Sequence, residues 1–459
     1  MRTICLLGAA LLSAPLHAAV TRYVALDGAH VPPFTNGWAG AATNIQLAVD
    51  ACVDGDTVVV SNGVYNSDSR PIPSYGSQNR VLITNAITVR SLSGPAATII
   101  EGLGPLGNLS VRGVYIKAGM LAGFTITNGH TRTIGTGEFR YYNQCGGGVN
   151  MYGGNGVISN CIMTGNRANS MGGGTFEGTV LDCVLCGNSA GSQGGGARGG
   201  EVRNSFIAGN SASEGGGLAS ATASNCLIAG CASGSSGGGG ASASTLWHCS
   251  ITGCTSFSGG GVLDSVVHCS VIKDNHAMYG GGAQGGHLFT CLIAGNLADD
   301  TGGGSFGGVL HNCTIVNNAA VATDGGGTLS GGLTNCIMWG NAAPEGSNYY
   351  ASDIAFSCSW PLPDGEGNTN ADPLFVNAAL GDFRLLGGSL CIDRGTNLPW
   401  MAGATDLDGN PRIHDGTVDM GCYEFVPEPG SFALLAAAVA FTARRATGWN
   451  ARCAQTGSQ

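Results

Sequence analysis

A run of three glycines recurs nine times along this chain, and it constrains the fold more than any other feature. After the first interval, successive runs begin 21 to 23 residues apart. Short apolar stretches that recur every 21 to 23 residues are typical of a solenoid, in which each repeat stacks only on its neighbours. The runs begin at Gly146, Gly172, Gly194, Gly215, Gly238, Gly259, Gly280, Gly302 and Gly325.

Each repeat also carries two small or polar positions at regular offsets. The first lies ten or eleven residues after the leading glycine of each later run, and its column is Cys183, Ser205, Cys226, Cys249, Cys269, Cys291, Cys313 and Cys336, joined by Cys161 after a small insertion in the first repeat. Five residues later stand Asn166, Asn188, Asn210, Cys231, Cys254, Asn296, Asn318 and Asn341, with Asn275 one residue late. Apolar residues three before and two after the first column indicate strands with one buried face.

These patterns predict an all-β fold, a right-handed single-stranded parallel β-helix with an N-terminal capping helix and a C-terminal cap. Coils would stack at about 4.8 Å, so that identical positions align as ladders. The glycines would form corners where a Cβ atom would crowd the next coil, and the column cysteines would be buried free thiols. The amphipathic stretch 43–60 supplies the capping helix and a first strand.

The ends and the charge of the chain bear on its location. Arg2, the apolar stretch 4–12 and a cleavage site after Ala18 or Ala19 predict a secretory signal peptide over residues 1–18. Export would permit disulfides. The formal net charge of -10 and the absence of basic clusters in the repeats argue against a nucleic-acid partner.

The sequence therefore divides into six segments. They are the signal peptide (1–18), an N-terminal cap with the first coils (19–145), regular repeats (146–344), a last coil with a C-terminal cap (345–425), an apolar segment (426–445) and a tail (446–459).

Several of these motifs resemble those of known families. The GGG and C-x-x-x-G-N repeats are similar to those of polymorphic outer-membrane proteins, and the early coils resemble those of secreted bacterial β-helix proteins. Residues 371–397 and 406–425 resemble the closing segment of many such proteins. Cys422 stands where Ala is usual, so the resemblance makes Cys391 and Cys422 a candidate disulfide; two unrelated buried thiols are the alternative.

The C-terminal segment resembles the PEP-CTERM sorting signal. It contains Pro427, Glu428 and Pro429, then an apolar run, then Arg444 and Arg445. The resemblance implies processing by an exosortase in a Gram-negative bacterium and membrane contact only through this tail. The apolar run is shorter than the roughly 20 residues of a comfortable membrane span.

No catalytic residue, metal ligand set or cofactor motif is assigned from the sequence. The acidic residues between 146 and 341 fall at different offsets in the repeat and do not form a carboxylate pair. His248 and His268 are interpreted as members of a polar ladder rather than metal ligands. The stretch 406–412 begins like a calcium loop but lacks its final glutamate, so Asp406, Asp408 and Arg412 are expected to make a structural polar cluster.

One stripe of residues suggests a binding surface. Trp247, Val267, Phe289 and His311 stand two residues before the column position on four successive coils, where side chains are expected to point outward. Such a stripe could bind sugar rings or a protein, unless the segment after Asn341 folds back over it. The sequence favours an adhesive or structural role at the cell surface, with a polysaccharide or another envelope component as partner. A polysaccharide lyase or glycoside hydrolase on the same fold and a self-assembling matrix protein are the alternatives.

Overall fold

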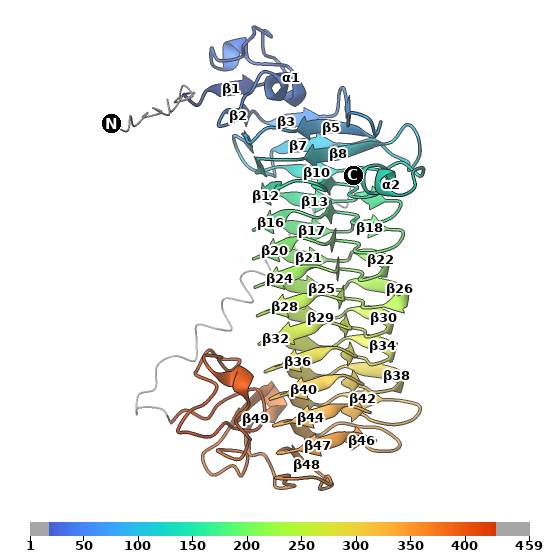
Figure 1. Ribbon diagram of the computed structural model, residues 1–459, viewed down its shortest axis with the longest axis vertical. Helices are drawn as coiled ribbons and strands as arrows, with labels where there is room; N and C mark the ends of the chain where they lie inside the picture. The colour runs from blue at the N-terminus through green and yellow to red at the C-terminus, as the bar shows by residue number, and fades with distance from the viewer. Residues whose placement is uncertain (1–17, 428–459) are drawn as a thin grey trace, which may run out of the picture.

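In the computed structural model, which describes residues 18–427, the chain winds into coils stacked along one axis (Figure 1). Strands from successive coils pair in parallel and form three long sheets of 14, 13 and 13 strands, with a fourth of eight along part of the column. The predicted right-handed parallel β-helix is confirmed. No helix between residues 18 and 427 is both long and apolar enough to span a membrane.

Sheet A carries the side chains of the predicted binding stripe. The middle residue of each regular strand points into the core, as Leu246, Val267 and Leu288 do. Its strands, in spatial order, are β1 (Thr21–Val24), β2 (Thr57–Val60), β6 (Thr88–Ser91), β9 (Met120–Ala122), β12 (Val157–Ser159), β16 (Thr179–Leu181), β20 (Glu201–Arg203), β24 (Thr222–Ser224), β28 (Thr245–Trp247), β32 (Val266–His268), β36 (His287–Phe289), β40 (Val309–His311), β44 (Gly332–Thr334) and β47 (Asp353–Ala355).

Sheet B follows sheet A across a tight corner in each coil. Its strands are β3 (Gly63–Tyr65), β7 (Thr98–Glu101), β10 (Thr125–Thr127), β13 (Ile162–Thr164), β17 (Val184–Cys186), β21 (Phe206–Ala208), β25 (Leu227–Ala229), β29 (Ser250–Thr252), β33 (Val271–Lys273), β37 (Leu292–Ala294), β41 (Thr314–Val316), β45 (Ile337–Trp339) and β48 (Cys358–Ser359). The middle residues of these strands, such as Ile251 and Ile293, complete the core.

Sheets C and D close the coils. Sheet C comprises β4 (Arg70–Pro71), β5 (Gln78–Ile83), β8 (Val111–Ile116), β11 (Val149–Asn150), β15 (Thr175–Phe176), β19 (Ala197–Arg198), β23 (Leu218–Ala219), β27 (Ala241–Ser242), β31 (Val262–Leu263), β35 (Ala283–Gln284), β39 (Ser305–Phe306), β43 (Thr328–Leu329) and β46 (Tyr349–Tyr350). Sheet D comprises β14 (Arg167–Ala168), β18 (Ser189–Ala190), β22 (Ser211–Glu214), β26 (Ala232–Gly237), β30 (Thr255–Ser258), β34 (His276–Tyr279), β38 (Leu297–Thr301) and β42 (Ala319–Ala320).

The triple glycines form corners for two different reasons. The first glycine of each run has a positive φ, such as +66° at Gly172 and +66° at Gly194, which residues with a side chain rarely adopt. The second glycine lies against the next coil, and a Cβ atom on Gly173 would come within 2.4 Å of the Gly195 carbonyl oxygen. The predicted role of the glycines is therefore confirmed.

Asparagine side chains form a buried hydrogen-bonded ladder between the coils. Asn296 Nδ2 donates to Asn318 Oδ1 (2.9 Å) and to the Ile272 carbonyl (2.9 Å). Its Oδ1 accepts from the backbone N–H of Asn275 (3.0 Å) and from Asn275 Nδ2 (3.0 Å). Each amide therefore satisfies backbone groups at a corner where the sheet ladder is interrupted.

The structure corrects the assigned position of Cys269. Ser270 occupies the column in that coil, and its Oγ accepts the backbone N–H of Cys249 at 3.0 Å. Cys269 lies at the corner with φ 45°, where other coils place Asn204, Asn225 or Asn312. With Ser270 in the column, Asn275 falls five residues later and is in register with the other asparagines.

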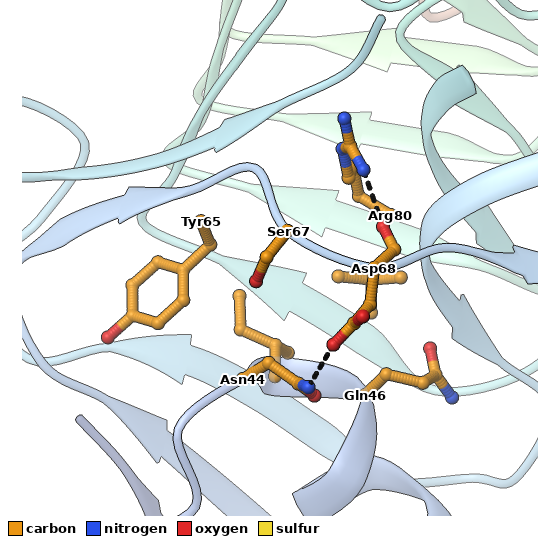
Figure 2. A pocket seen from close by; sticks show the side chains of 8 residues that line it. Asn44, Gln46, Tyr65, Ser67, Asp68 and Arg80 are labelled. Carbon is orange, nitrogen blue, oxygen red and sulfur yellow. Dashed lines mark hydrogen bonds between the residues drawn. The ribbon is translucent and has the colours of Figure 1, made fainter. Parts of the chain in front are cut away.

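The N-terminal end of the column is covered by the predicted helix, α1 (Ile45–Asp50). Its N-cap Asn44 accepts the Leu47 N–H at 2.9 Å, and Asn44 Nδ2 donates to Asp68 at 2.7 Å (Figure 2). Gln46 pairs through its amide with both backbone groups of Leu82 in β5. The cavity that these residues line (Figure 2) has a volume of only about 10 Å³, which is about the size needed for one water molecule. Their hydrogen bonds therefore hold the helix on the column rather than bind a ligand.

The segment after β48 has two parts. Residues 360–370 cover the end of the column, where Asn368 and Thr369 bond to Ser357 and Ser359. The following residues fold back beside sheets A and B and form a cap that includes the antiparallel pair β49 (Phe375–Asn377) and β50 (Asp382–Leu385) (Figure 1). Shorter helical elements are η1 (Trp38–Gly40), α2 (Glu138–Gln144), η2 (Ala378–Leu380) and η3 (Pro399–Met401).

We expect Asn296→Ala to lower the free energy of unfolding by about 3 kcal/mol, because several buried polar groups lose their partners at once. Denaturant midpoints of the full chain, followed by circular dichroism, measure this. The control is Cys254→Ala in the same ladder, which removes only a thiol and should cost about 1 kcal/mol. Equal losses in the two variants would show that the asparagine ladder contributes no special stability.

Candidate functional site

Four rings from four successive coils stack face to face on the outer side of sheet A. The ring centroids of Trp247 and His268 are 3.7 Å apart with an interplanar angle of 6°. Those of His268 and Phe289 are 4.7 Å apart at 6°, and those of Phe289 and His311 are 5.4 Å apart at 27°. The third residues of β28, β32, β36 and β40 pair in register, so the ladder itself holds the rings in contact.

This stack corrects one member of the predicted stripe. Val267 is the middle residue of β32; it is fully buried in the core and cannot belong to an outer surface. The reason is the same as at Cys269. In this coil, both predicted residues lie one position before the ladder positions that the other coils use. His268 takes the outward position instead, while Trp247, Phe289 and His311 lie where the sequence predicts.

The cap covers one end of the ring stack. Trp400, in η3, packs edge-on against Phe289 with ring centroids 5.1 Å apart and lies 6.3 Å from the His311 ring. The cap is fastened to sheet corners by Asn335, whose Nδ2 donates to the Thr396 carbonyl at 2.9 Å. Trp247, at the opposite end, retains 41% of its surface exposed. The expected fold-back of the C-terminal segment therefore covers half of the stack and leaves Trp247 open.

We call the outer ladder position of Ser224, between Trp247 and Arg203, the notch. The preceding position on the ladder is Ser224, a small side chain, and the one before that is Arg203. Two coil steps separate Trp247 from Arg203, which is about 9.6 Å at the usual strand spacing. Arg203 Nε donates to Glu201 at 2.7 Å, so the far side of the notch is a neutral ion pair. The notch thus has an aromatic wall on one side and hydrogen-bonding groups on the other.

The histidines in the stack are held in the neutral form. Burial, with a smaller contribution from the neighbouring His248, lowers the pKa of His268 to about 4. Burial and then His287 also lower the pKa of His311. Neutral imidazoles stack on the adjacent rings without the cost of desolvating a charge.

A second surface feature is a hollow of about 620 Å³ at the corner between sheets C and A. Its lining includes Lys117, Tyr152 and Glu177. Glu177 is paired with Arg198 at 2.7 Å, whereas the Lys117 ammonium has no bonded partner among residues 18–427. Tyr152 rests on Tyr141, with ring centroids 4.8 Å apart. The loop 151–156 that forms one wall is an insertion relative to the regular coils.

The structure does not support the predicted Cys391–Cys422 disulfide. Both thiols are buried, and they lie in different apolar clusters. The backbone N–H of Cys422 donates to Thr314 Oγ1 at 3.1 Å, whereas Cys391 packs against Cys358, two coils further along sheet B. The two residues therefore face different strands. The column cysteines other than Cys269 are buried, as predicted.

The cap contains the polar cluster expected around residues 406–412, with one change. Arg412 is fully buried and pairs with Glu424 at 2.8 Å, while Asp406 accepts the backbone N–H of Asn410 at 2.7 Å. Asp408 joins the cluster only through its backbone N–H, which donates to Asp406, while its carboxylate accepts from Arg384. Burial raises the pKa of Glu424 to about 8 against the opposing effect of Arg412.

Two further observations concern the other predicted sites. Within residues 18–427, no three His, Cys, Asp or Glu side chains are grouped so that they could hold a metal ion. Of the sorting-signal residues, Pro427 is the last that the structure describes; Glu428, Pro429, Arg444 and Arg445 lie outside the described residues.

Comparison with known proteins finds similarity at the level of the fold. No protein-family model and no curated protein sequence matches the chain. Among solved structures, it is similar to the pectate lyase Pel9A (12% identity, TM-score 0.39), covering 90% of this chain and 98% of the other. XylC in complex with xylose gives 10% identity and a TM-score of 0.42, with 89% and 99% covered.

A rhamnogalacturonan lyase is similar at 12% identity and a TM-score of 0.33, covering 78% of this chain and 91% of that one. These structural neighbours share the parallel β-helix. At such identities and TM-scores the similarity concerns the fold alone, and we transfer no site residue from it.

His268 should make the folded protein less stable as the pH falls from about 6.5 to about 4. Its pKa is lower in the folded state, so the unfolded chain binds more protons over this range and is favoured. Denaturant midpoints measured across this range test the effect. His268→Phe keeps a ring in the stack but removes the titrating group, so its midpoint should fall less on acidification. Identical pH dependence in the variant and the natural protein would contradict the low pKa.

Proposed function

We propose that this protein is an exported β-helix protein with an adhesive or structural role at the envelope or exopolysaccharide matrix of a Gram-negative bacterium. In this proposal, residues 1–18 direct export, the C-terminal segment is processed by an exosortase, and the membrane is contacted only through that segment. The observation that carries the proposed activity is the ring stack that ends in the exposed face of Trp247.

The ligand we propose is a polysaccharide with uncharged sugar rings. A sugar ring has an apolar face that packs on an indole, and in this proposal one ring lies on Trp247 beside the small side chain of Ser224. Its hydroxyl groups would meet Arg203 and Glu201. Because these two charges neutralise one another, an acidic sugar gains no net attraction there.

Rigidity also favours this surface as a binding site. The rings stacked behind Trp247 and the cap residue Trp400 hold the array before any ligand arrives. Little side-chain entropy is then lost on binding. The coils continue at a constant spacing on both sides of the stack, so a polymer chain could lie along the column beside it.

Trp247→Ala should reduce polysaccharide affinity at least about tenfold, as expected for a central aromatic contact. Affinity electrophoresis of the full chain in gels containing neutral polysaccharides, followed by calorimetry with derived oligosaccharides, provides the measurement. Phe257→Ala is the matched control, because Phe257 is a similarly exposed aromatic residue, 47% accessible, in β30 of sheet D. Equal affinity in both variants would exclude the ring stack as the binding surface.

A polysaccharide-degrading enzyme is the second candidate function, favoured by the hollow near Lys117. An unpaired ammonium, a tyrosine and a carboxylate surround a space large enough for a sugar unit. A lysine can abstract a proton, and a phenol can return one.

If this hollow is an active site, the full chain should release unsaturated or reducing ends from a polysaccharide, and Lys117→Ala should abolish that release. Absorbance of unsaturated products and a reducing-end assay measure the two reaction types. Lys273→Ala is the control, because Lys273 is also exposed but lies in β33, away from the hollow. Turnover that persists in Lys117→Ala would place the chemistry elsewhere, and binding without any turnover would favour the adhesive role.

A further inference from the structure

Cys358 differs from the cysteines of the buried column in the direction of its side chain. The column position of its coil is Ser357, whose Oγ accepts the Cys336 N–H at 2.9 Å. Cys358 is the next residue and pairs with Ile337 in the sheet B ladder. Because side chains alternate along a strand, Cys358 points away from the core and toward the cap. It packs with Leu385 and Met420 rather than with the central core.

Cys391 reaches the same place from the cap. Its carbonyl accepts the Met420 N–H at 3.0 Å, and its backbone N–H donates to Ser389 Oγ at 3.2 Å. Cys391 belongs to the same buried cluster as Cys358, whose thiol donates to the Ala371 carbonyl at 3.2 Å. Both side chains are fully buried. The two cysteines thus meet at the junction between the last coil and the cap.

The other neighbouring thiols have a different geometry. Cys226 and Cys249, like Cys231 and Cys254, occupy one ladder position in successive parallel coils, with their side chains pointing the same way. Their Cβ atoms are held about 4.8 Å apart by the coil spacing. A disulfide needs Cβ atoms about 3.5–4.5 Å apart, so bonding a stacked pair would pull two coils together. No coil spacing constrains Cys358 and Cys391, because Cys391 is not part of the ladder.

We propose that Cys358 and Cys391 form a disulfide bond that fastens the cap to the last coil. Both thiols lose a proton and together two electrons, and the oxidant is a disulfide of a protein or of glutathione, which is reduced to two thiols. The bond would close a loop of 33 residues. Since both sulfurs are buried once the cap has docked, oxidation would occur during folding in an oxidising compartment.

The bond would also preserve the ring stack. The cap presents Trp400 to Phe289, and it reaches the sheet corners through a few hydrogen bonds such as that of Asn335. A covalent link between the cap and the last coil shortens the chain that is free to move when those bonds open. The cap should therefore stay docked longer in the oxidised protein.

Peptide mapping of the full chain tests the proposal directly. Protein made in an oxidising compartment is unfolded in the presence of an alkylating reagent, digested, and analysed by mass spectrometry. The expected result is a cross-linked peptide pair containing Cys358 and Cys391, which is absent after production in a reducing cytoplasm. A Cys391–Cys422 pair, a cross-link within the column, or alkylation of both Cys358 and Cys391 in the oxidised protein would overturn the proposal.

Proteolysis of the cap supplies a second measurement. We expect cleavage within residues 371–427 to be at least fivefold faster for Cys391→Ser than for the oxidised protein. The control variant Cys422→Ser should be cleaved at the same rate as the oxidised protein. Peptide mapping of the unsubstituted chain decides the outcome independently if Cys391→Ser does not fold. Equal cleavage rates for the oxidised protein and a well-folded Cys391→Ser variant would show that no such bond fastens the cap.

Discussion

The spacing between parallel coils, about 4.8 Å, is the constraint on which the rest of this structure depends. It places the same position of each repeat directly beside its counterpart, so every side chain must tolerate a copy or near-copy of itself above and below. Asparagine meets this requirement by donating to one neighbour and accepting from the other, as Asn296 does between Asn275 and Asn318. Glycine meets it where the chains approach too closely for a Cβ atom, as at Gly173.

The same spacing turns scattered aromatic residues into a surface. Trp247 and Phe289 lie two coils apart and would not touch without a ring between them; His268 supplies that ring. A single exposed tryptophan on a loop would adopt several rotamers. On this ladder, its inner face is held against an imidazole that burial keeps neutral. The outer face is consequently a fixed platform, which explains why the binding proposal depends on Trp247 rather than on the more covered Phe289.

The repeat made the fold and the corners predictable, because both depend on local spacing. The predicted register fails in one coil because a cysteine there stands one residue before the column: Ser270 lies eleven residues after Gly259, as Cys249 does after Gly238 and Cys291 after Gly280. A constant offset would have identified Ser270, and with it His268 as the outward residue. The position of Trp400 could not be inferred in this way, since the cap has no repeat and its contacts join residues far apart in the sequence, such as Phe289 and Trp400.

The cap also shows why pairing of cysteines cannot be deduced from their presence in one closing segment. Cys391 and Cys422 belong to the same cap, yet the strands beneath them differ: Cys422 lies over Thr314 and Cys391 over Cys358. In a solenoid, the coil beneath a residue determines its neighbours more strongly than proximity in the sequence does. Thiols that repeat along one ladder are held parallel and apart, whereas thiols that meet across an interface are free to approach. Disulfides in such folds should therefore be sought where the repeat ends.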